Sequence, residues 1–169
     1  MNIPRVFKPR KSLGWLWLAG LGLIMLGFTV LPLLTTPREG PLFGILLPLL
    51  LGVVIGGGAL LLAALFPTMR YELHEDALVM IYGPWKFRVP YQSIRKVSWQ
   101  DLSVSLWSSF RLPGFALFTV PYNDVGNVQM CATSASKRIL LIKTDAGQFG
   151  LTPREEQPFI DALMARVRS

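Results

Sequence analysis

The sequence predicts a two-helix transmembrane hairpin followed by a mainly-β soluble domain. Three observations support this fold class. Two long apolar stretches without charged residues occupy most of the first 69 residues. A short segment rich in turn residues separates them. The last hundred residues carry nearly all the remaining charges and change to short runs of alternating polar and apolar residues, which is typical of β-strands.

Each apolar stretch is long enough to cross a membrane. Residues 13–34 form a run of 22 residues without a charge, which as a helix reaches about 33 Å, against a hydrocarbon core of about 30 Å. Residues 42–66 form a second run of 25 residues, which can span with some tilt. A cleaved signal peptide is disfavoured, because its apolar region is normally shorter and no small-residue cleavage site follows the first run.

Residues 35–41 join the two predicted spans. They contain two prolines, one glycine and a charged pair within seven residues, a composition that indicates a turn. So short a connection requires the two helices to be antiparallel neighbours. We therefore expect an external turn between transmembrane helices 13–34 and 42–66.

The distribution of basic residues predicts the orientation in the membrane. The basic N-terminal flank, residues 1–12, carries four Lys or Arg, whereas the turn carries only Arg38. The flank after the second span supplies Arg70, Lys86 and Arg88. By the positive-inside rule both termini are expected to be cytoplasmic, in a two-pass protein of the cell (inner) membrane.

A stripe of small residues runs along the second predicted span, in which Gly44, Gly52 and Gly56 recur at multiples of four. Such a stripe lets helix backbones approach closely. Packing against the first helix is the favoured interpretation, because the short turn already provides a partner, and homodimerisation is the alternative. Neither span contains an ionisable side chain, so the hairpin is expected to be an anchor and not a transport pathway.

The net charge of +7 does not indicate nucleic-acid binding. From Pro67 onward there are twelve basic and nine acidic residues, with no basic cluster interleaved with aromatics. A mildly basic domain on an anchor suits an anionic membrane surface better. Cys131 is the only cysteine and His74 the only histidine, so we expect no intramolecular disulfide, no metal site and no cofactor.

The soluble part, residues 68–169, is predicted to contain about seven strands and one helix. Turn residues separate runs with strand-like patterns at 69–73, 77–82, 86–89, 94–99, 102–107, 138–143 and 148–151. Residues 111–130 are less regular and are interpreted as a long connection. From about Glu156 the apolar residues follow helical spacing, which predicts a C-terminal helix.

Three stretches of this part resemble a known family. They are YELHEDALVMIYGPWKFRVPYQSIRKV, RLPGFAL and RILLIKTDAGQFGLTPREEQPFIDAL. In this order and spacing they are similar to the bacterial pleckstrin-homology-like (PH) domains that occur attached to membrane helices, with Thr152-Pro153 where that family shows Ser-Pro. The resemblance covers about residues 69 to 168. It implies a bent, partly open β-barrel of antiparallel strands, capped by the C-terminal helix, and it implies no reaction.

The resemblance also suggests a basic site. Eukaryotic PH domains bind phosphoinositides through a Lys-x-Arg pattern, and Lys86 and Arg88 have that spacing. Alternation along a strand places both on one face, with Arg95 and Lys96 as candidate neighbours for an anionic lipid head group. The alternative is an ordinary solvated strand face beside an anionic membrane.

Catalysis has little support in the sequence. Asp101, Ser103 and Ser105 could be combined with His74 into a hydrolytic site, but no nucleophile motif surrounds either serine. The stretch Arg111–Phe118 is interpreted as core, as a membrane-dipping loop or as a docking surface.

We therefore predict a non-catalytic, membrane-anchored binding or assembly module. Its expected partners are membrane lipids and a second protein, and no nucleic acid is expected. Homo-oligomers could form through the glycine stripe. A sensor of anionic lipid head groups is the alternative function, and an enzyme is a distant third.

Overall fold

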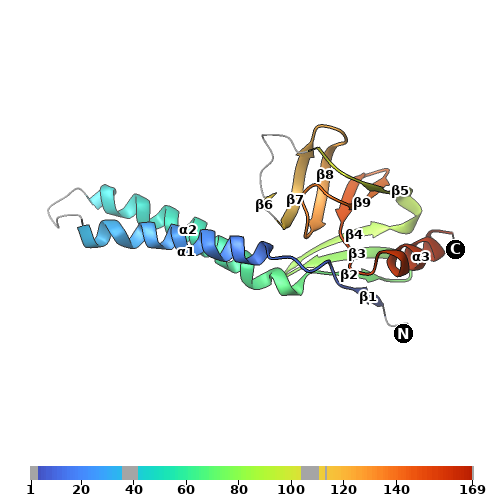
Figure 1. The fold of residues 1–169 in the computed structure, drawn as a ribbon, viewed down its shortest axis with the longest axis horizontal. Helices are drawn as coiled ribbons and strands as arrows, with labels where there is room; N and C mark the ends of the chain where they lie inside the picture. The colour runs from blue at the N-terminus through green and yellow to red at the C-terminus, as the bar shows by residue number, and fades with distance from the viewer. Residues whose placement is uncertain (1–3, 36–41, 104–110, 113, 169) are drawn as a thin grey trace. The chain divides into compact units, whose positions relative to one another are not determined.

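A computed structural model describes residues 4–35, 42–103, 111–112 and 114–168 (Figure 1). The chain divides into two compact units. One is the helical unit, Gly14–Phe66, and the other is the soluble unit, which combines Met1–Leu13 with Pro67–Ser169. The two units are described separately below.

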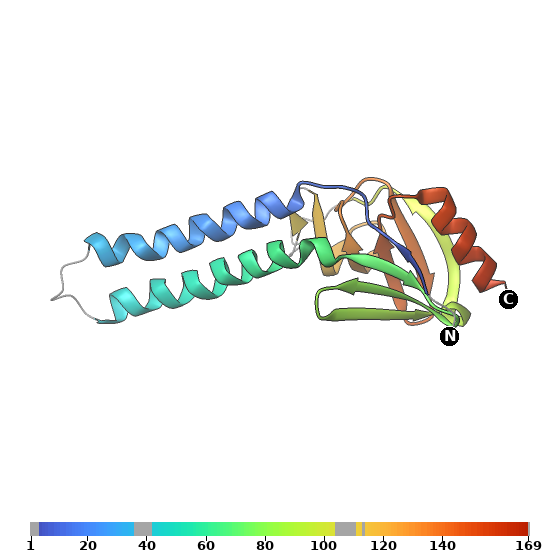
Figure 2. The same cartoon turned by 90° about the horizontal axis from the view of Figure 1, so that it is seen from below.

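The helical unit consists of α1 (Gly14–Thr35) and α2 (Leu42–Leu65). The two helices lie side by side, and both are long and apolar enough to cross a membrane by length and composition (Figures 1 and 2). Their bounds agree within about a residue with the two predicted runs. The predicted turn lies almost entirely outside the described residues. Pro48 is accommodated within α2, as neighbouring helices allow in membrane segments.

The small-residue stripe brings the two helix backbones together at two positions. A Cβ atom built on Gly52 would lie 1.7 Å from Thr29 Cγ2, and one built on Gly56 would lie 2.9 Å from the Gly22 carbonyl oxygen. Both distances are too short for a real side chain, so these sites admit only glycine without repacking. Gly57, by contrast, has open space where its Cβ would stand. Gly44 lies in α2, but its packing is outside what the structure describes.

The soluble unit begins with a four-stranded antiparallel sheet in the order β1-β2-β3-β4. Its strands are β1 (Arg5–Phe7), β2 (Arg70–Leu73), β3 (Ala77–Tyr82) and β4 (Trp85–Pro90). A short 3₁₀ turn, η1 (Phe66–Thr68), precedes β2, and a second, η2 (Tyr91–Ser93), follows β4. The strand that follows η2 belongs to a different sheet.

The second sheet has six strands in the order β5-β9-β10-β8-β7-β6. They are β5 (Ile94–Gln100), β6 (Arg111–Leu112), β7 (Phe115–Tyr122), β8 (Gly126–Ala132), β9 (Ile139–Thr144) and β10 (Gly147–Leu151). Neighbouring strands are antiparallel except β10 and β8, which pair in parallel. Helix α3 (Glu156–Val167) closes the chain.

This architecture differs from the predicted one in four respects. The described residues form ten strands instead of about seven, and these are divided between a four-stranded and a six-stranded sheet where one partly open barrel was expected. The strands are not all antiparallel, because the β9–β10 hairpin inserts β10 directly beside β8. The predicted long connection over 111–130 contains the β7–β8 hairpin. Of the predicted strand 102–107, Leu102 and Ser103 lie outside any strand and the rest is outside the described residues.

The segment before the first helix is part of the soluble unit. This segment is strongly basic, yet its strand β1 pairs with β2 (Figure 2). The pairing places Phe7 opposite Tyr71. The following residues pair with the segment that leads into α3, since the Lys8 carbonyl accepts the Arg154 N–H at 2.9 Å and the Arg10 N–H donates to the Thr152 carbonyl at 2.8 Å. The soluble unit is therefore built from both ends of the chain.

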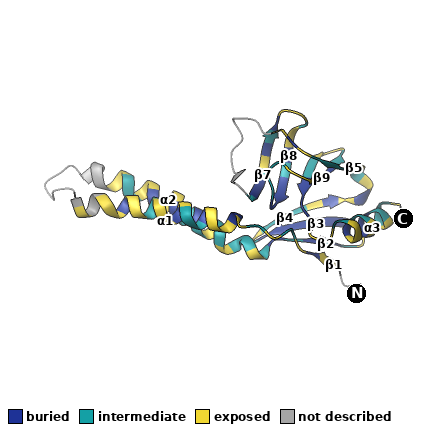
Figure 3. Cartoon of the chain, in the orientation of Figure 1, coloured by how far each residue is buried: buried dark blue, intermediate teal, exposed yellow. Residues whose placement is uncertain are grey.

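The strands of the six-stranded sheet contain many buried residues, and buried apolar side chains lie on both of its faces (Figure 3). On one face a cluster contains Leu102, Ala116, Val120, Tyr122, Val128, Met130, Ala132, Ile139 and Leu141. On the other face the Tyr71 hydroxyl donates to the Cys131 carbonyl at 2.7 Å and accepts the Thr152 N–H at 3.2 Å, which links the two sheets. Phe159 of α3 completes this core, packing edge-on against Phe7 with ring centroids 5.1 Å apart.

Candidate binding groove between the two sheets

The four predicted lipid-contacting residues do not share one sheet. Lys86 and Arg88 are exposed on β4, at the edge of the four-stranded sheet, whereas Arg95 and Lys96 are exposed on β5 of the other sheet. Strand alternation puts Lys86 and Arg88 on the same face, as the sequence indicated. The structure therefore presents two separate basic pairs.

Two of these cations already have carboxylate partners. Arg88 forms an ion pair with Asp76, which precedes β3. Arg95 binds both carboxylate oxygens of Asp145 at 2.7 Å each. This bidentate contact raises the pKa of the Arg95 guanidinium and lowers the pKa of the Asp145 carboxyl. An anionic head group would have to compete with both carboxylates.

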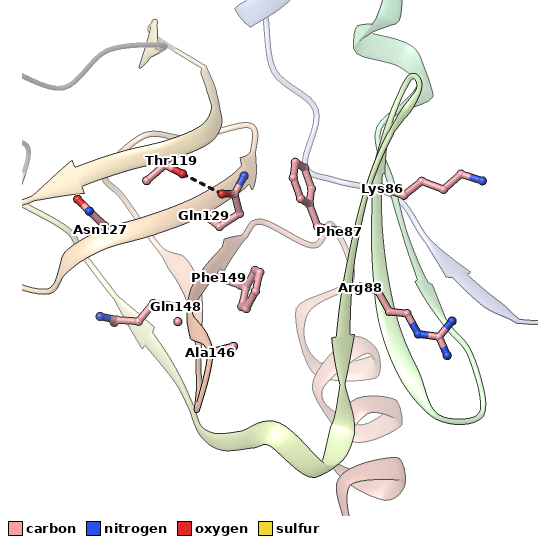
Figure 4. A pocket seen from close by; sticks show the side chains of 10 residues that line it. Lys86, Phe87, Arg88, Thr119, Asn127, Gln129, Ala146, Gln148 and Phe149 are labelled. Atoms are coloured by element: carbon pink, nitrogen blue, oxygen red, sulfur yellow. Dashed lines mark hydrogen bonds between the residues drawn. The ribbon is translucent and has the colours of Figure 1, made fainter.

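A groove of about 480 Å³ opens on the opposite face of β4 (Figure 4). Its lining comes from β4 on one side and, on the other, from β7, β8, β10 and the turn before β10: Lys86, Phe87, Arg88, Thr119, Asn127, Gln129, Ala146, Gly147, Gln148 and Phe149. Figure 4 shows Phe87 and Phe149 facing the groove from its two sides. The side chains of Lys86 and Arg88 point away from it.

The register of the second sheet explains its polar wall. Thr119 lies opposite Gln129, which in turn lies beside Phe149, so these three side chains share one face of the sheet. Asn127, two residues before Gln129, falls on the same face. The Thr119 hydroxyl lies 2.9 Å from Gln129 Oε1 and donates a hydrogen bond to it. The wall therefore offers hydroxyl and amide groups without a formal charge.

The backbone of β4 also faces the groove. Tyr82 and Trp85 flank the two-residue turn Gly83-Pro84, so they form the hydrogen-bonded pair that closes the hairpin. Hydrogen-bonded and non-hydrogen-bonded residue pairs alternate along two antiparallel strands. The backbones of Phe87 and Val89 therefore hydrogen-bond to β3, while the N–H and C=O groups of Lys86 and Arg88 point away from β3. Pro90 agrees with this alternation, since it lacks an N–H and occupies an outward position on the same strand.

Aromatic rings lie where β4 meets β7. Trp85 stacks on Tyr82, with centroids 6.0 Å apart, and contacts Phe118 edge-on at 5.3 Å. Phe118 has φ of 63°, a left-handed conformation that is uncommon for a bulky residue within a strand. The ring of Phe118 contacts Trp85 from this uncommon backbone conformation. Phe115, Ala116 and Leu117 are buried, so this part of Arg111–Phe118 belongs to the core.

Asp101 and Ser103, two of the residues considered for catalysis, take part in separate local contacts. Asp101 accepts the Arg138 N–H at 2.6 Å, and the Ser103 N–H donates to Asp124 at 2.6 Å. Ser105 lies outside the described residues.

His74 and Glu72 belong to another local cluster. Glu72 accepts a hydrogen bond from Arg70 at 2.7 Å and lies 3.0 Å from His74 Nε2. The Arg70 hydrogen bond, followed by the contact with His74, lowers the pKa of the Glu72 carboxyl. Within the described part of the chain, no three His, Cys, Asp or Glu residues gather as a metal site would require.

Comparison with known protein families identifies the family of the soluble unit. Residues 69–167 match the family described as Bacterial PH domain. The chain belongs to this family. The matched region begins at β2, so the N-terminal β1 of this PH unit lies outside it. No curated protein and no solved structure matches the chain.

The groove residues Phe87, Phe149, Thr119, Asn127 and Gln129 were not foreseen from the sequence. Alternation in 86–89 indicates only that Phe87 faces away from its basic neighbours. Nothing in the sequence pattern shows that β7, β8 and β10 would stand opposite it.

Proposed function

We propose that this protein is a membrane-anchored, non-catalytic PH module that binds or assembles a partner protein at the inner face of the cell membrane. The observation that carries the proposal is the open groove beside β4, whose facing side chains are aromatic or neutral polar (Figure 4). Hydrogen-bonding groups without charge suit a polypeptide better than a phosphate or an ionic substrate.

The connectivity of the PH unit supports the membrane topology. The chain leaves this unit after Leu13 and returns to it at Pro67, so both ends of the helical hairpin join one folded body. Two ends joined to one body lie on the same side of a membrane. The excess of basic residues at these ends favours the cytoplasmic side. A reporter fused after Ser169 should therefore be active only in the cytoplasm, and an extracellular signal would refute this topology.

Site-specific photocrosslinking tests the binding function. Phe149 faces the groove, and its replacement by p-benzoylphenylalanine keeps an aromatic ring at that position. Irradiation of intact cells should give a reproducible crosslinked partner. The same photoprobe at Lys137, an exposed residue that does not line the groove, is the control. Equal crosslinking from both positions, or none from Phe149, would refute the proposal.

Recognition of anionic head groups is the second candidate. It is favoured by Lys86 and Lys96, which are exposed and have no ion pair among the described residues. It is weakened by the carboxylates bound to Arg88 and Arg95. The full chain can be reconstituted into vesicles with and without phosphatidylglycerol. If the chain senses anionic lipid, its hydrogen exchange should differ between the two kinds of vesicle. The Lys86→Ala/Lys96→Ala double variant should then show no such difference, and a difference that persists in the variant would refute this candidate.

A further inference from the structure

We propose that β4 accepts an extended acidic segment of the partner protein as an added β-strand. This inference rests on the proposed binding function and specifies its ligand. The added segment would lie along the groove and alternate neutral side chains, facing the groove, with acidic side chains on the opposite face.

The free edge of β4 supplies the main-chain contacts. β4 is the last strand of its sheet and pairs only with β3 among the described strands. The outward N–H and C=O groups of Lys86 and Arg88 have the spacing of an unpaired strand edge, so a further strand could form backbone hydrogen bonds with them. The adjoining groove, with a volume of about 480 Å³, is open to solvent on this side of β4.

The side chains on the two faces of β4 define the chemistry of the segment. Residues of an added strand that face the groove would meet Phe87, Phe149 and the Thr119–Gln129 pair, which favour small polar or aliphatic side chains. The alternate residues would lie beside Lys86 and Arg88. On the other side of these two residues β3 offers only Ile81 and Val79. Arg88 is paired with Asp76, whereas Lys86 has no ion pair among the described residues, so an acidic side chain on the added strand would complement Lys86 first and would share Arg88 with Asp76.

The same charges argue against a second copy of this chain as the occupant. Antiparallel pairing of two β4 edges would place Lys86 and Arg88 of one chain beside the same residues of the other. Like charges directly opposite one another destabilise a strand pair. The edge therefore discriminates in favour of a different, acidic strand.

Backbone and side-chain substitutions at one position separate strand addition from charge recognition. Arg88→Pro removes an outward N–H and leaves the ladder to β3 in place, as Pro90 already does two residues later. Arg88→Ala keeps the N–H and removes only the charge. If the segment pairs with the edge, Arg88→Pro should weaken binding about tenfold or more, and Arg88→Ala only a few-fold.

The probe is a phage-displayed library of short peptides, selected against the full chain in lipid nanodiscs. Selected peptides should alternate acidic and neutral residues and lose binding to Arg88→Pro. N-methylation of every second peptide amide, which changes nothing in the protein, should abolish binding in one register and spare it in the other. This second measurement decides the matter if Arg88→Pro fails to fold, which the reactivity of the buried Cys131 thiol would reveal.

Peptides that bind Arg88→Pro as well as the native chain, or a selection that yields none, would overturn strand addition. Binding that depends on anionic lipid in the nanodisc would overturn it in favour of the membrane. Crosslinking at Phe149 that persists unchanged in Arg88→Pro would leave the binding module intact and refute only the added strand.

Discussion

Replacing Phe7 by alanine tests whether the N-terminal segment belongs to the folded PH unit. Phe7 is only 4% exposed, and its ring packs edge-on against the fully buried Phe159 at 5.1 Å. Truncating a buried phenylalanine costs about 3–5 kcal/mol. We expect a value near the lower end, about 3 kcal/mol, because a three-residue edge strand can relax around the lost ring.

Val6 provides the matched control. It lies in the same strand but is 51% exposed, so Val6→Ala should change the free energy of unfolding by about 0.5 kcal/mol or less. Both variants keep the charge and length of the segment. A difference between them therefore reports burial and not the basic character of the N-terminus.

The single cysteine supplies the assay. Burial raises the pKa of the Cys131 thiol to about 12, so a thiol reagent at neutral pH labels it only after the PH unit unfolds. Urea titration of the full chain in detergent, followed by a labelling pulse, gives the midpoint. With a urea dependence of about 2 kcal/mol per M, Phe7→Ala should lower that midpoint by roughly 1.5 M. Equal midpoints for the two variants would refute the assignment of β1 to the PH unit.

Three further predictions concern buried contacts. Tyr71→Phe should destabilise the PH unit by about 1–3 kcal/mol in the same assay, because it leaves a buried carbonyl and a buried N–H without their partner; no loss would show that water replaces the hydroxyl. Gly52→Ala should destabilise the hairpin in SDS titration by about 1–3 kcal/mol through overlap with Thr29, whereas Gly57→Ala should not; equal effects would contradict the interhelical contact. The pKa of Glu72 is lowered in the folded state, so its contribution is present above the ordinary pKa of about 4.3 and is lost as pH falls through the lower folded value. Glu72→Gln should therefore flatten the stability profile below about pH 5, and an unchanged acid limb would contradict the shift.

The local patterns of the chain predicted much of its secondary structure. Alternating polar and apolar residues indicated β2, β4 and β5, short apolar runs bounded by turn residues indicated β3, β9 and β10, and helical spacing identified α3. These signals are local, because each depends on which residues within one element are apolar. The β7–β8 hairpin was missed because Pro121 and Asn123-Asp124 read as loop signals, although here Pro121 lies within the strand and Asn123-Asp124 form its turn.

Strand β1 was missed for a different reason. Its three residues, Arg5–Phe7, are too few for a periodic signal. They also lie in a basic segment, and the positive-inside rule already accounts for such a segment next to a predicted transmembrane helix. Only their pairing with β2, more than sixty residues later, makes them a strand. The same holds for the groove, since Phe87 and Phe149 face one another only after both sheets have formed.

The sequence by itself thus determined the apolar hairpin, the resemblance to bacterial PH domains and the type of most strands, because hydrophobic periodicity and span length are properties of contiguous residues. The tertiary structure decided which edge of which sheet stays open, where the basic residues lie and which carboxylates hold them. These features depend on contacts between residues far apart in the chain, whose pairing no local pattern specifies. The basic strand that suggested a lipid site is, on its other face, the wall of a neutral groove.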